Sequence, residues 1–227
     1  MCGRFANYLT VQEAARLFEA DPDAVSWTPR YNVAPGTDIL ACRQDDGRHL
    51  CLLRWGLVPS WAREPATGYR MINARAETVA DKPAFRAAFR RRRCLIPANG
   101  FYEWQAGPGG GPPRTPWYFR RRDGRPLAMA GLWERWTRGD TPLESCTIIV
   151  TAANRAVAPC HDRMPVLLPE DAFDPWLDPG SSREALHALL QPAPDDLLEA
   201  WPVSRAVNDP RNDDPGLLAP AAGPEPS

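Results

Sequence analysis

Lysine is almost absent from this sequence. Lys82 is the only one, so arginine carries nearly all of the positive charge. Arginine presents a planar fork that suits phosphate groups, although a GC-rich genome would also favour arginine codons. For chemistry in which an amine attacks a carbonyl, the scarcity leaves two amines, the ε-amine of Lys82 and the α-amine at the start of the chain.

A strong net charge and a metal-binding pattern are also absent. The formal net charge of −1 gives no overall attraction to nucleic acid, so any such binding must rest on a local basic surface. The six cysteines form no CxxC pair and show no regular framework. We expect no metal and no cofactor. A metal site at Cys2, Glu103 and His161 stays as an alternative, although these residues lack the short spacing of zinc ligands.

The sequence also lacks a signal peptide and a long apolar run. No such run approaches the roughly 18 residues of a membrane-spanning helix. We therefore expect a monomeric protein of the cytoplasm, with reduced thiols and no membrane partner.

The residues that are present fit one domain. The chain has 227 residues, 44% of them hydrophobic, which allows a sizeable core. Many short strand patterns and few helical ones predict an α+β fold, with a mixed or barrel-like β-sheet core and a few peripheral helices. We expect a single folded domain over residues 2–212 and a disordered, proline-rich tail over residues 213–227.

Several local patterns predict particular elements. Thr10-Val11-Gln12-Glu13 reads as a capping box that opens a helix through Glu19. Strands over Trp117–Arg121 and Pro126–Ala130 should form a hairpin around Asp123-Gly124. Gly107–Pro116 should be an exposed, flexible loop, and Asp195–Ala200 a surface helix.

The second residue of the chain is a cysteine. Methionine aminopeptidase tends to remove Met1 before a small side chain, which would give Cys2 a free α-amine next to its thiol. An α-amine has a pKa of about 7.7–8.0, so a useful fraction is neutral at physiological pH. A neutral amine can form an imine with an aldehyde, and the neighbouring thiol can close on the imine carbon to give a thiazolidine.

Four segments place polar residues between apolar flanks, namely Cys2–Phe5, Met71–Thr78, Asn99–Trp104 and Cys160–Pro165. Together with three further segments they resemble a known family. The matching blocks, in order, are MCGRF from residue 1, RYNVAPG from Arg30, RWGLVPSWA from Arg54, INARAET from Ile72, RRCLIPANGFYEW from Arg92, HDRMPVLL from His161 and VNDPRND from Val207. They are similar to the SRAP family, the abasic-site-processing proteins first named SOS-response-associated peptidases. The resemblance runs from Cys2 to about Asn212.

The resemblance implies a function and a set of site residues. Cys2 looks like the residue that crosslinks to the ring-opened aldehyde of an abasic site in single-stranded DNA. Asn73, Glu103 and His161 look like its companions in the active site. The chemistry agrees, because imine formation needs a general acid and a general base. Glu103 between two aromatic residues can hold a raised pKa, and His161 titrates near neutral pH.

DNA binding should rest on residues beside these positions. Arginines that neighbour the catalytic residues are candidates for phosphate contacts, and exposed rings or prolines can stack on or wedge against bases. The candidates are Arg4, Arg75, Arg163, Trp61 and Pro35. The Arg90–Arg93 run either contacts DNA or complements the dipole of the helix that it ends.

Two other functions remain open. In the first, the protein is an N-terminal-nucleophile peptidase whose Cys2 attacks an amide of its own leader or of a peptide. In the second, it is a non-enzymatic module that binds damaged or methylated DNA. The expected partner in the favoured reading is single-stranded DNA that contains abasic sites, with the protein on the nucleoid while it is bound.

Overall fold

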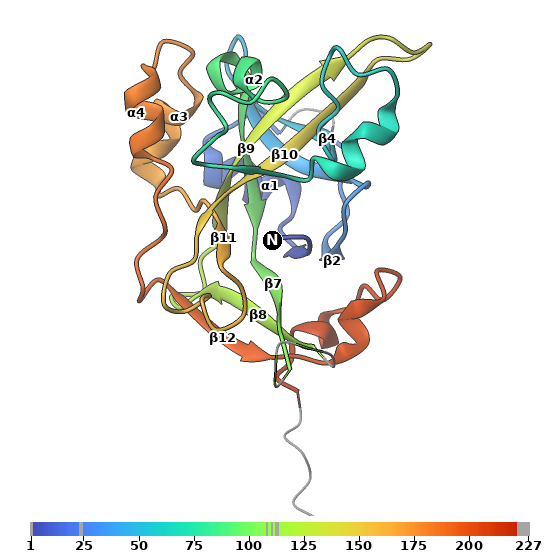
Figure 1. The fold of residues 1–227 in the computed structure, drawn as a ribbon, viewed down its shortest axis with the longest axis vertical. Helices are drawn as coiled ribbons and strands as arrows, with labels where there is room; N and C mark the ends of the chain where they lie inside the picture. The colour runs from blue at the N-terminus through green and yellow to red at the C-terminus, as the bar shows by residue number, and fades with distance from the viewer. Residues whose placement is uncertain (1, 23–24, 108, 110, 112–113, 222–227) are drawn as a thin grey trace, which may run out of the picture.

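The structure is a computed structural model that describes residues 2–22, 25–107, 109, 111 and 114–221. Its strands form two sheets with a few helices around them (Figure 1). The strands are β1 (Phe5–Asn7), β2 (Arg30–Val33), β3 (Asp38–Gln44), β4 (Arg48–Trp55), β5 (Asn73–Arg75), β6 (Arg93–Ala98), β7 (Gly100–Gln105), β8 (Thr115–Arg121), β9 (Leu127–Trp136), β10 (Leu143–Ala152), β11 (Arg163–Pro165) and β12 (Leu198–Pro202). The helices are α1 (Val11–Phe18), α2 (Arg86–Arg91), α3 (Phe173–Leu177) and α4 (Arg183–Ala188), with 3-10 turns η1 (Pro65–Arg70), η3 (Glu170–Ala172), η4 (Arg205–Asn208) and η5 (Pro215–Leu218).

Five strands close into a barrel. β4 pairs with β3, β3 with β6, β6 with β9 and β9 with β10, and β10 returns parallel to β4. β5 and β11 pair with the later part of β10. Closure removes exposed strand edges from these five strands. The prediction of an α+β fold with a barrel-like core is confirmed.

The other sheet has five strands in the order β12-β8-β7-β1-β2. It lies below the barrel in Figure 1, and the dark blue start of the chain lies between the barrel strands and β7 in this view. β6 of the barrel leads directly into β7 of this sheet, with Asn99 between them. This passage fixes how the two sheets meet.

Alternate residues of the barrel strands fall into two cores. Leu40, Leu95 and Ile149 pack with residues of the covering helices, such as Phe18 and Trp176. Because helices can cover only the outside of a closed barrel, this core is the outer one. The residues between them, such as Ile39, Ile96 and Ile148, form the inner core together with Cys2, Phe5 and Phe101 of the second sheet. The start of the chain is therefore part of the inner core.

Helix α1 begins as its sequence predicts. The side chain of Thr10 accepts a hydrogen bond from the backbone of Glu13, and the Glu13 carboxylate accepts one from the backbone of Thr10. Phe18 at its end packs edge-on against Phe173, with ring centroids 5.4 Å apart. The predicted capping box is confirmed.

The predicted hairpin over Trp117–Arg121 and Pro126–Ala130 is wrong. The turn at Asp123-Gly124 forms, but β8 pairs with β7 and β12, whereas β9 pairs with β6 and β10. The turn therefore carries the chain from one sheet to the other. β9 is buried along most of its length and needs a partner strand on both sides, which the local turn signal does not show.

The predicted surface helix over Asp195–Ala200 is also wrong. Leu198–Pro202 is the edge strand β12, whose Trp201 packs on Tyr118 with ring centroids 5.6 Å apart. A short apolar run does not by itself distinguish a strand from a helix, and here the pairing with β8 decides. The predicted loop Gly107–Pro116 joins β7 to β8, and part of it lies outside the described residues.

Residues 213–221 differ from the predicted disordered tail. Leu217 of η5 is buried, and Trp201 donates its indole N–H to the carbonyl of Leu218 over 2.8 Å. Asp213 accepts backbone hydrogen bonds from Tyr31 and Asn32 at the start of β2. Specific packing and capping thus order a segment whose composition alone predicts disorder. The rest of the predicted tail, residues 222–227, lies outside the described residues.

Candidate active site

The N-terminal segment lies along β7. Phe5 pairs with Phe101, and Tyr102 donates its backbone N–H to the carbonyl of Arg4 over 2.9 Å. Continued by two residues, this antiparallel register brings the start of the chain beside Glu103. Cys2 is fully buried, and burial followed by the charge of Glu103 raises the pKa of its thiol well above the usual range. The thiol is therefore protonated at neutral pH.

Glu103 is a carboxyl group inside the protein. Only 3% of its surface is exposed. Burial raises the pKa of Glu103 to about 7; the positive charge of the amino terminus opposes this rise, and Asp162 adds to it. A carboxyl group with that pKa is about half protonated near neutral pH, so it can accept and donate a proton under the same conditions. The sequence predicts a raised pKa for Glu103 because Tyr102 and Trp104 flank it, and the structure gives a shift in this direction.

His161 precedes β11 and is held in one tautomer. Its Nδ1 accepts a hydrogen bond from the backbone N–H of Arg163 over 3.0 Å, so a neutral ring carries its proton on Nε2. Asp162 Oδ1 lies 2.8 Å from the same Nδ1, a contact that needs a proton there. Burial, and after it the charge of the amino terminus, lowers the pKa of His161 although Asp162 opposes the shift. We therefore assign the neutral ring with Nε2–H.

Asn73 presents a side-chain amide without a partner. It opens β5, which pairs with β10 at Ile148. Both its Oδ1 and its Nδ2 are buried, and within the described part of the chain neither forms a hydrogen bond. Buried amides are nearly always bonded, so Asn73 has donors and an acceptor left for a water molecule or a ligand.

Direct contacts and short-range charge interactions connect these segments to one another. Arg163 forms an ion pair with Glu77, which joins the chain after Asn73 to the chain after His161. The charge of Asp162 acts on Glu103, and Glu103 acts on Cys2. The structure thus brings the four predicted catalytic segments to one corner.

A second thiol lies at this corner and was not predicted. Cys160 is half-buried and packs against the inner core, and burial together with the charge of Glu103 raises its pKa to about 11. Its place next to His161 in the sequence was the available signal. A protonated, half-buried thiol adds apolar surface to the corner.

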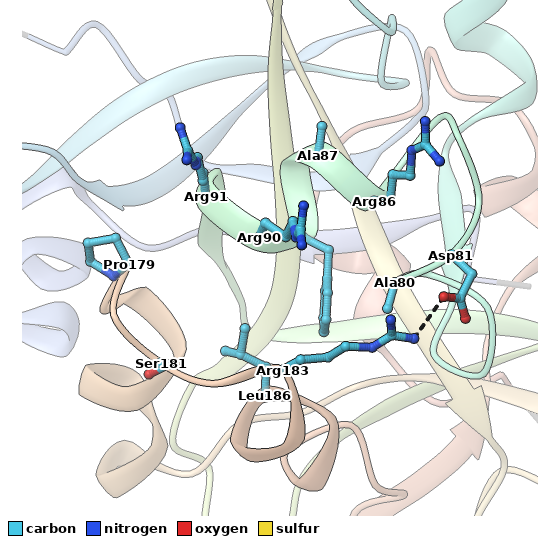
Figure 2. A pocket seen from close by; sticks show the side chains of 11 residues that line it. Ala80, Asp81, Arg86, Ala87, Arg90, Arg91, Pro179, Ser181, Arg183 and Leu186 are labelled. Carbon is cyan, nitrogen blue, oxygen red and sulfur yellow. Dashed lines mark hydrogen bonds and ion pairs between the residues drawn. The ribbon is translucent and has the colours of Figure 1, made fainter.

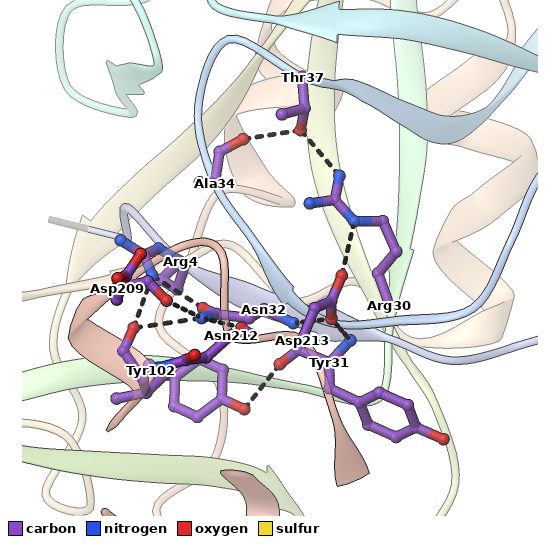
Figure 3. A network of polar contacts seen from close by, with 11 residues as sticks. Arg4, Arg30, Tyr31, Asn32, Ala34, Thr37, Tyr102, Asp209, Asn212 and Asp213 are labelled. Carbon is purple, nitrogen blue, oxygen red and sulfur yellow. Dashed lines mark hydrogen bonds and ion pairs between the residues drawn. The ribbon is translucent and has the colours of Figure 1, made fainter. Parts of the chain in front are cut away.

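Arg4 belongs to a polar network that ties the start of the chain to its end (Figure 3). Its Nη1 donates to Asn32 Oδ1 over 2.8 Å and to the carbonyl of Val207 over 2.7 Å. The fully buried amide of Asn32 also donates to the carbonyls of Val207, Asp209 and Asn212. Asn32 was not predicted as a functional residue, although it lies in the matched block that starts at Arg30. The network fixes the backbone two residues after Cys2.

The other two predicted arginines differ in their surroundings. Arg75 is exposed on β5. Arg163 has 20% of its side chain exposed and is paired with Glu77. Arg75 therefore offers a freely accessible charge, whereas Arg163 shares its charge with a carboxylate.

Two large aromatic side chains are exposed to solvent. Trp61 has 52% of its surface exposed and Tyr69 has 63%. Tyr69 lies against Gly36, the residue after Pro35, and its hydroxyl accepts a hydrogen bond from Arg54 over 3.2 Å. Tyr69 was missed in the sequence, because no periodicity distinguishes an exposed ring in a 3-10 turn from a packed one.

No group of three or more His, Cys, Asp or Glu side chains among the described residues is arranged to hold a metal ion. No helix in the part of the chain that the structure describes has the length and apolar character needed to cross a membrane.

Comparisons with known proteins identify relatives of this chain. The family described as SOS response associated peptidase (SRAP) matches residues 1–210. The chain is 42% identical to the abasic site processing protein YoaM of Bacillus subtilis, over 96% of this chain and 97% of that protein. It is 33% identical to YedK of Escherichia coli, over 97% and 100%. It is 34% identical to the abasic site processing protein HMCES of Gallus gallus, over 86% and 67%.

Solved structures show the same fold. A protein from Bacteroides thetaiotaomicron superposes with a TM-score of 0.88 at 24% identity, over 97% of this chain and 100% of that one. A protein from Bordetella bronchiseptica superposes with a TM-score of 0.77 at 28% identity, over 89% and 100%. From the match over residues 1–210 and these relatives, we conclude that the chain belongs to the SRAP family.

Proposed function

We propose that this protein captures abasic sites in single-stranded DNA by a covalent bond from Cys2 and so protects the lesion. The observation that carries the proposal is the buried Cys2 beside Glu103, whose pKa is about 7. The names of the relatives, abasic site processing proteins, support it. The activity requires that Met1 has been removed, because only then is the α-amine of Cys2 free to react.

The bond forms in two additions. The neutral amine attacks the aldehyde carbon of the ring-opened sugar, and the resulting carbinolamine loses its hydroxyl group as water to give an imine. The thiol sulfur then adds to the imine carbon, and the thiol proton passes to the nitrogen. The product is a five-membered thiazolidine whose mass is that of protein plus DNA minus one water.

Glu103 serves both additions in this proposal. Its carboxylate takes a proton from the attacking amine, and its acid form returns a proton to the leaving hydroxyl group. The Cys2 thiol also needs a base when it adds to the imine, because burial keeps it protonated. The carboxylate whose charge acts on this thiol is Glu103.

His161 and Asn73 act on the sugar in this proposal. The Nε2–H of a neutral His161 donates toward the ring oxygen as the sugar opens. The unpartnered amide of Asn73 donates and accepts at once, which suits a group that orients the amine and the sugar hydroxyls.

The DNA strand reaches this corner over the basic and aromatic residues beside it. Arg75 and Arg163 contact the flanking phosphates, and Arg4 adds a further contact although its Nη1 is already bonded. Trp61, Pro35 and the newly recognised Tyr69 meet the neighbouring bases. In this proposal the protein acts as a monomer in the cytoplasm and binds exposed single-stranded DNA there.

The peptidase reading is less compatible with the site. A cysteine peptidase attacks through its thiolate, and a lowered thiol pKa marks such cysteines. Here burial raises the pKa of Cys2 instead. A slow autocatalytic loss of a leader remains the second candidate, because the family description contains the word peptidase.

One experiment separates the two functions. The mature protein is mixed with single-stranded DNA carrying one abasic site, and separately with peptide substrates, and intact masses are measured. We expect a product at the summed mass minus one water, absent with Cys2→Ala, and no peptide cleavage. Peptide turnover without any DNA adduct would replace the proposal by the peptidase.

A further inference from the structure

A second basic feature lies between α2 and α4. A cavity of about 810 Å³ is bounded on one side by α2 and on the other by Pro179 and the start of α4 (Figure 2). Four arginines line it, Arg86, Arg90 and Arg91 from α2 and Arg183 from α4, and Asp81 is the lining residue with a negative charge. This concentration of charge contrasts with the net charge of −1 of the whole chain.

Most of this charge has no internal counterpart. Arg183 forms an ion pair with Asp81 at 2.8 Å, with 55% and 68% of the two side chains exposed. Within the described residues, Arg86, Arg90 and Arg91 form no ion pair and no side-chain hydrogen bond. Three positive charges on one six-residue helix are therefore open to a ligand.

The dipole of α2 explains the positive charge at only two of these three arginines. Arg90 and Arg91 lie in the last turn of α2, where positive charge complements the helix dipole. Arg86 is the first residue of the helix, where positive charge opposes the dipole, and it stands four positions before Arg90, where like charges repel. Arg86 therefore gains no stabilisation from the helix dipole or from Arg90, and its exposed charge is available to an anion.

The inner surface of the cavity is apolar. Phe89 and Leu186 are buried beneath it, and Ala80 and Ala87 line it as well. The exposed large aromatic residues of the described chain, Trp61 and Tyr69, are not among its lining. A single-stranded nucleic acid would find phosphate ligands here but no ring on which to stack its bases.

We propose that this cavity, called the groove from here on, binds a short acidic peptide segment of a partner protein. Its carboxylates would meet the forks of Arg86 and Arg90, and an apolar side chain would lie over Phe89 and Leu186. The volume of about 810 Å³ fits within the range of about 300–1,000 Å³ that is usual for pockets of small ligands and anchors.

The groove leaves the active site free. α2 leads into β6, and β6 leads into β7, which carries Glu103. β6 has six residues and spans about 20 Å, and it lies along the chain between α2, which lines the groove, and β7, which carries Glu103. A partner docked at the groove can therefore hold the protein near DNA while Cys2 reacts, and the proposal does not depend on the proposed crosslinking activity.

The test measures peptide binding to the full-length protein. The probe is a fluorescein-labelled peptide of aspartates and glutamates around a central leucine–phenylalanine pair, followed by fluorescence anisotropy. We expect binding that weakens about tenfold or more in Arg86→Glu/Arg90→Glu, which corresponds to about 1.4 kcal/mol or more. Replacing the leucine–phenylalanine pair by serine and glycine in the probe should also weaken binding to the wild-type protein.

Matched controls make the outcome decisive. Arg16→Glu/Arg135→Glu changes the same total charge at exposed positions outside the groove, and it should bind the probe like the wild type. If charge reversal unfolds α2, Arg86→Gln/Arg90→Gln keeps a good helix former and should still weaken binding. The proposal is overturned by equal losses in both double variants, by no effect of the apolar pair, or by an oligothymidylate that binds through the same arginines and displaces the peptide.

Discussion

Cys2 has none of its surface exposed and Glu103 only 3%, whereas Trp61 and Tyr69, on the face proposed to meet DNA, have 52% and 63% exposed. The first pair is held by two layers of structure. β1 and β7 place the backbone, and the Arg4–Asn32 network fixes the segment from the side of the C-terminal residues. Of the second pair, Tyr69 follows a turn in which Gly56 and Gly68 approach so closely that neither tolerates a Cβ atom.

The difference follows from what each region has to do. A raised pKa requires removal of water, and a proton transfer requires fixed geometry, so the reactive groups must be buried. A surface that accepts successive bases must instead stay open and tolerate any sequence. Substitutions at the buried corner should therefore change rates by orders of magnitude, and substitutions on the open face should change affinities by smaller factors.

The largest effect is expected at Cys2. Cys2→Ala should abolish the covalent adduct, and Cys2→Ser should lose the heat-stable adduct, because a hydroxyl group closes the ring less readily than a thiol. Denaturing gels with abasic single-stranded DNA measure both, and borohydride should trap the transient imine of the serine variant. Lys82→Arg is the matched amine control and should react normally; loss of the adduct there would transfer the reacting amine to Lys82.

Glu103→Gln should come next. It preserves size and hydrogen bonding but removes the proton transfer, which usually contributes about 10²–10⁴-fold in rate. DNA affinity should hardly change. Time courses of adduct formation at saturating protein check the rate, and a wild-type rate would remove Glu103 from the mechanism.

The same variant should be more stable than the wild type at pH 8. Glu103 has a folded-state pKa of about 7 against an ordinary value of 4.5, so the folded chain holds this proton more tightly than the unfolded chain. The stability of the wild type therefore falls as the pH rises from about 4.5 to about 7. The penalty reaches at most the order of 3 kcal/mol above that range. Melting temperatures at pH 5 and pH 8 test this, and a residue that merely packs would give a variant that is less stable at both.

His161→Ala should slow the reaction and change its pH dependence. Burial lowers the pKa of His161, so the wild-type ring is neutral throughout neutral pH. The rate of the wild type should therefore change only below the ordinary pKa of histidine. The variant lacks the Nε2–H donor and should react more slowly at every neutral pH. Rates of adduct formation between about pH 5 and pH 8 decide this. An unchanged profile in a folded variant would leave His161 with a structural role alone.

The two regions also differ in how well the sequence predicts them. The predicted catalytic residues lie in contiguous blocks with a recognisable order, and the structure brings the segments of Cys2, Glu103 and His161 to one corner. Tyr69 and Asn32 escaped prediction, because their roles come from contacts with Arg54, Gly36 and the chain near Asn212 that are distant in sequence.

The fold shows the same limit. The capping box of α1 and the hairpin of β3 and β4 depend on neighbouring residues and were predictable. The crossing from β8 to β9 and the strand β12 depend on which sheet supplies a partner, and a turn signal at Asp123-Gly124 carries no information about that. Asp213 is held by contacts that lie far away in sequence, such as the 181 positions that separate it from Asn32, and Leu218 is held by Trp201 of β12.

On the open face, the aromatic residues should give the larger loss. Stacking of one base contributes about 1–3 kcal/mol, so Trp61→Ala or Tyr69→Ala should weaken binding of single-stranded DNA about five- to 150-fold. The rate of adduct formation at saturating DNA should stay near that of the wild type. Fluorescence anisotropy with a thymidine oligomer measures the affinity. A Tyr69→Phe control separates the ring from the hydroxyl group that bonds Arg54.

The smallest effects should distinguish the two arginines that flank the corner. One phosphate contact contributes about 0.7 to the slope of log affinity against log salt, which amounts to about fourfold at 0.15 M salt. Arg75→Ala should lose this full amount, because Arg75 is exposed. Arg163→Ala should lose less, because Arg163 must first give up part of its ion pair with Glu77, and exposed pairs are worth about 0–1 kcal/mol.

Glu77→Gln should therefore tighten DNA binding by freeing Arg163, and should have no such effect when Arg163 is already alanine. Salt titrations of the four proteins in this double-mutant cycle measure the coupling. If Glu77→Gln changes affinity equally in both backgrounds, Arg163 does not reach the phosphates and acts only as the tie between the Asn73 and His161 segments.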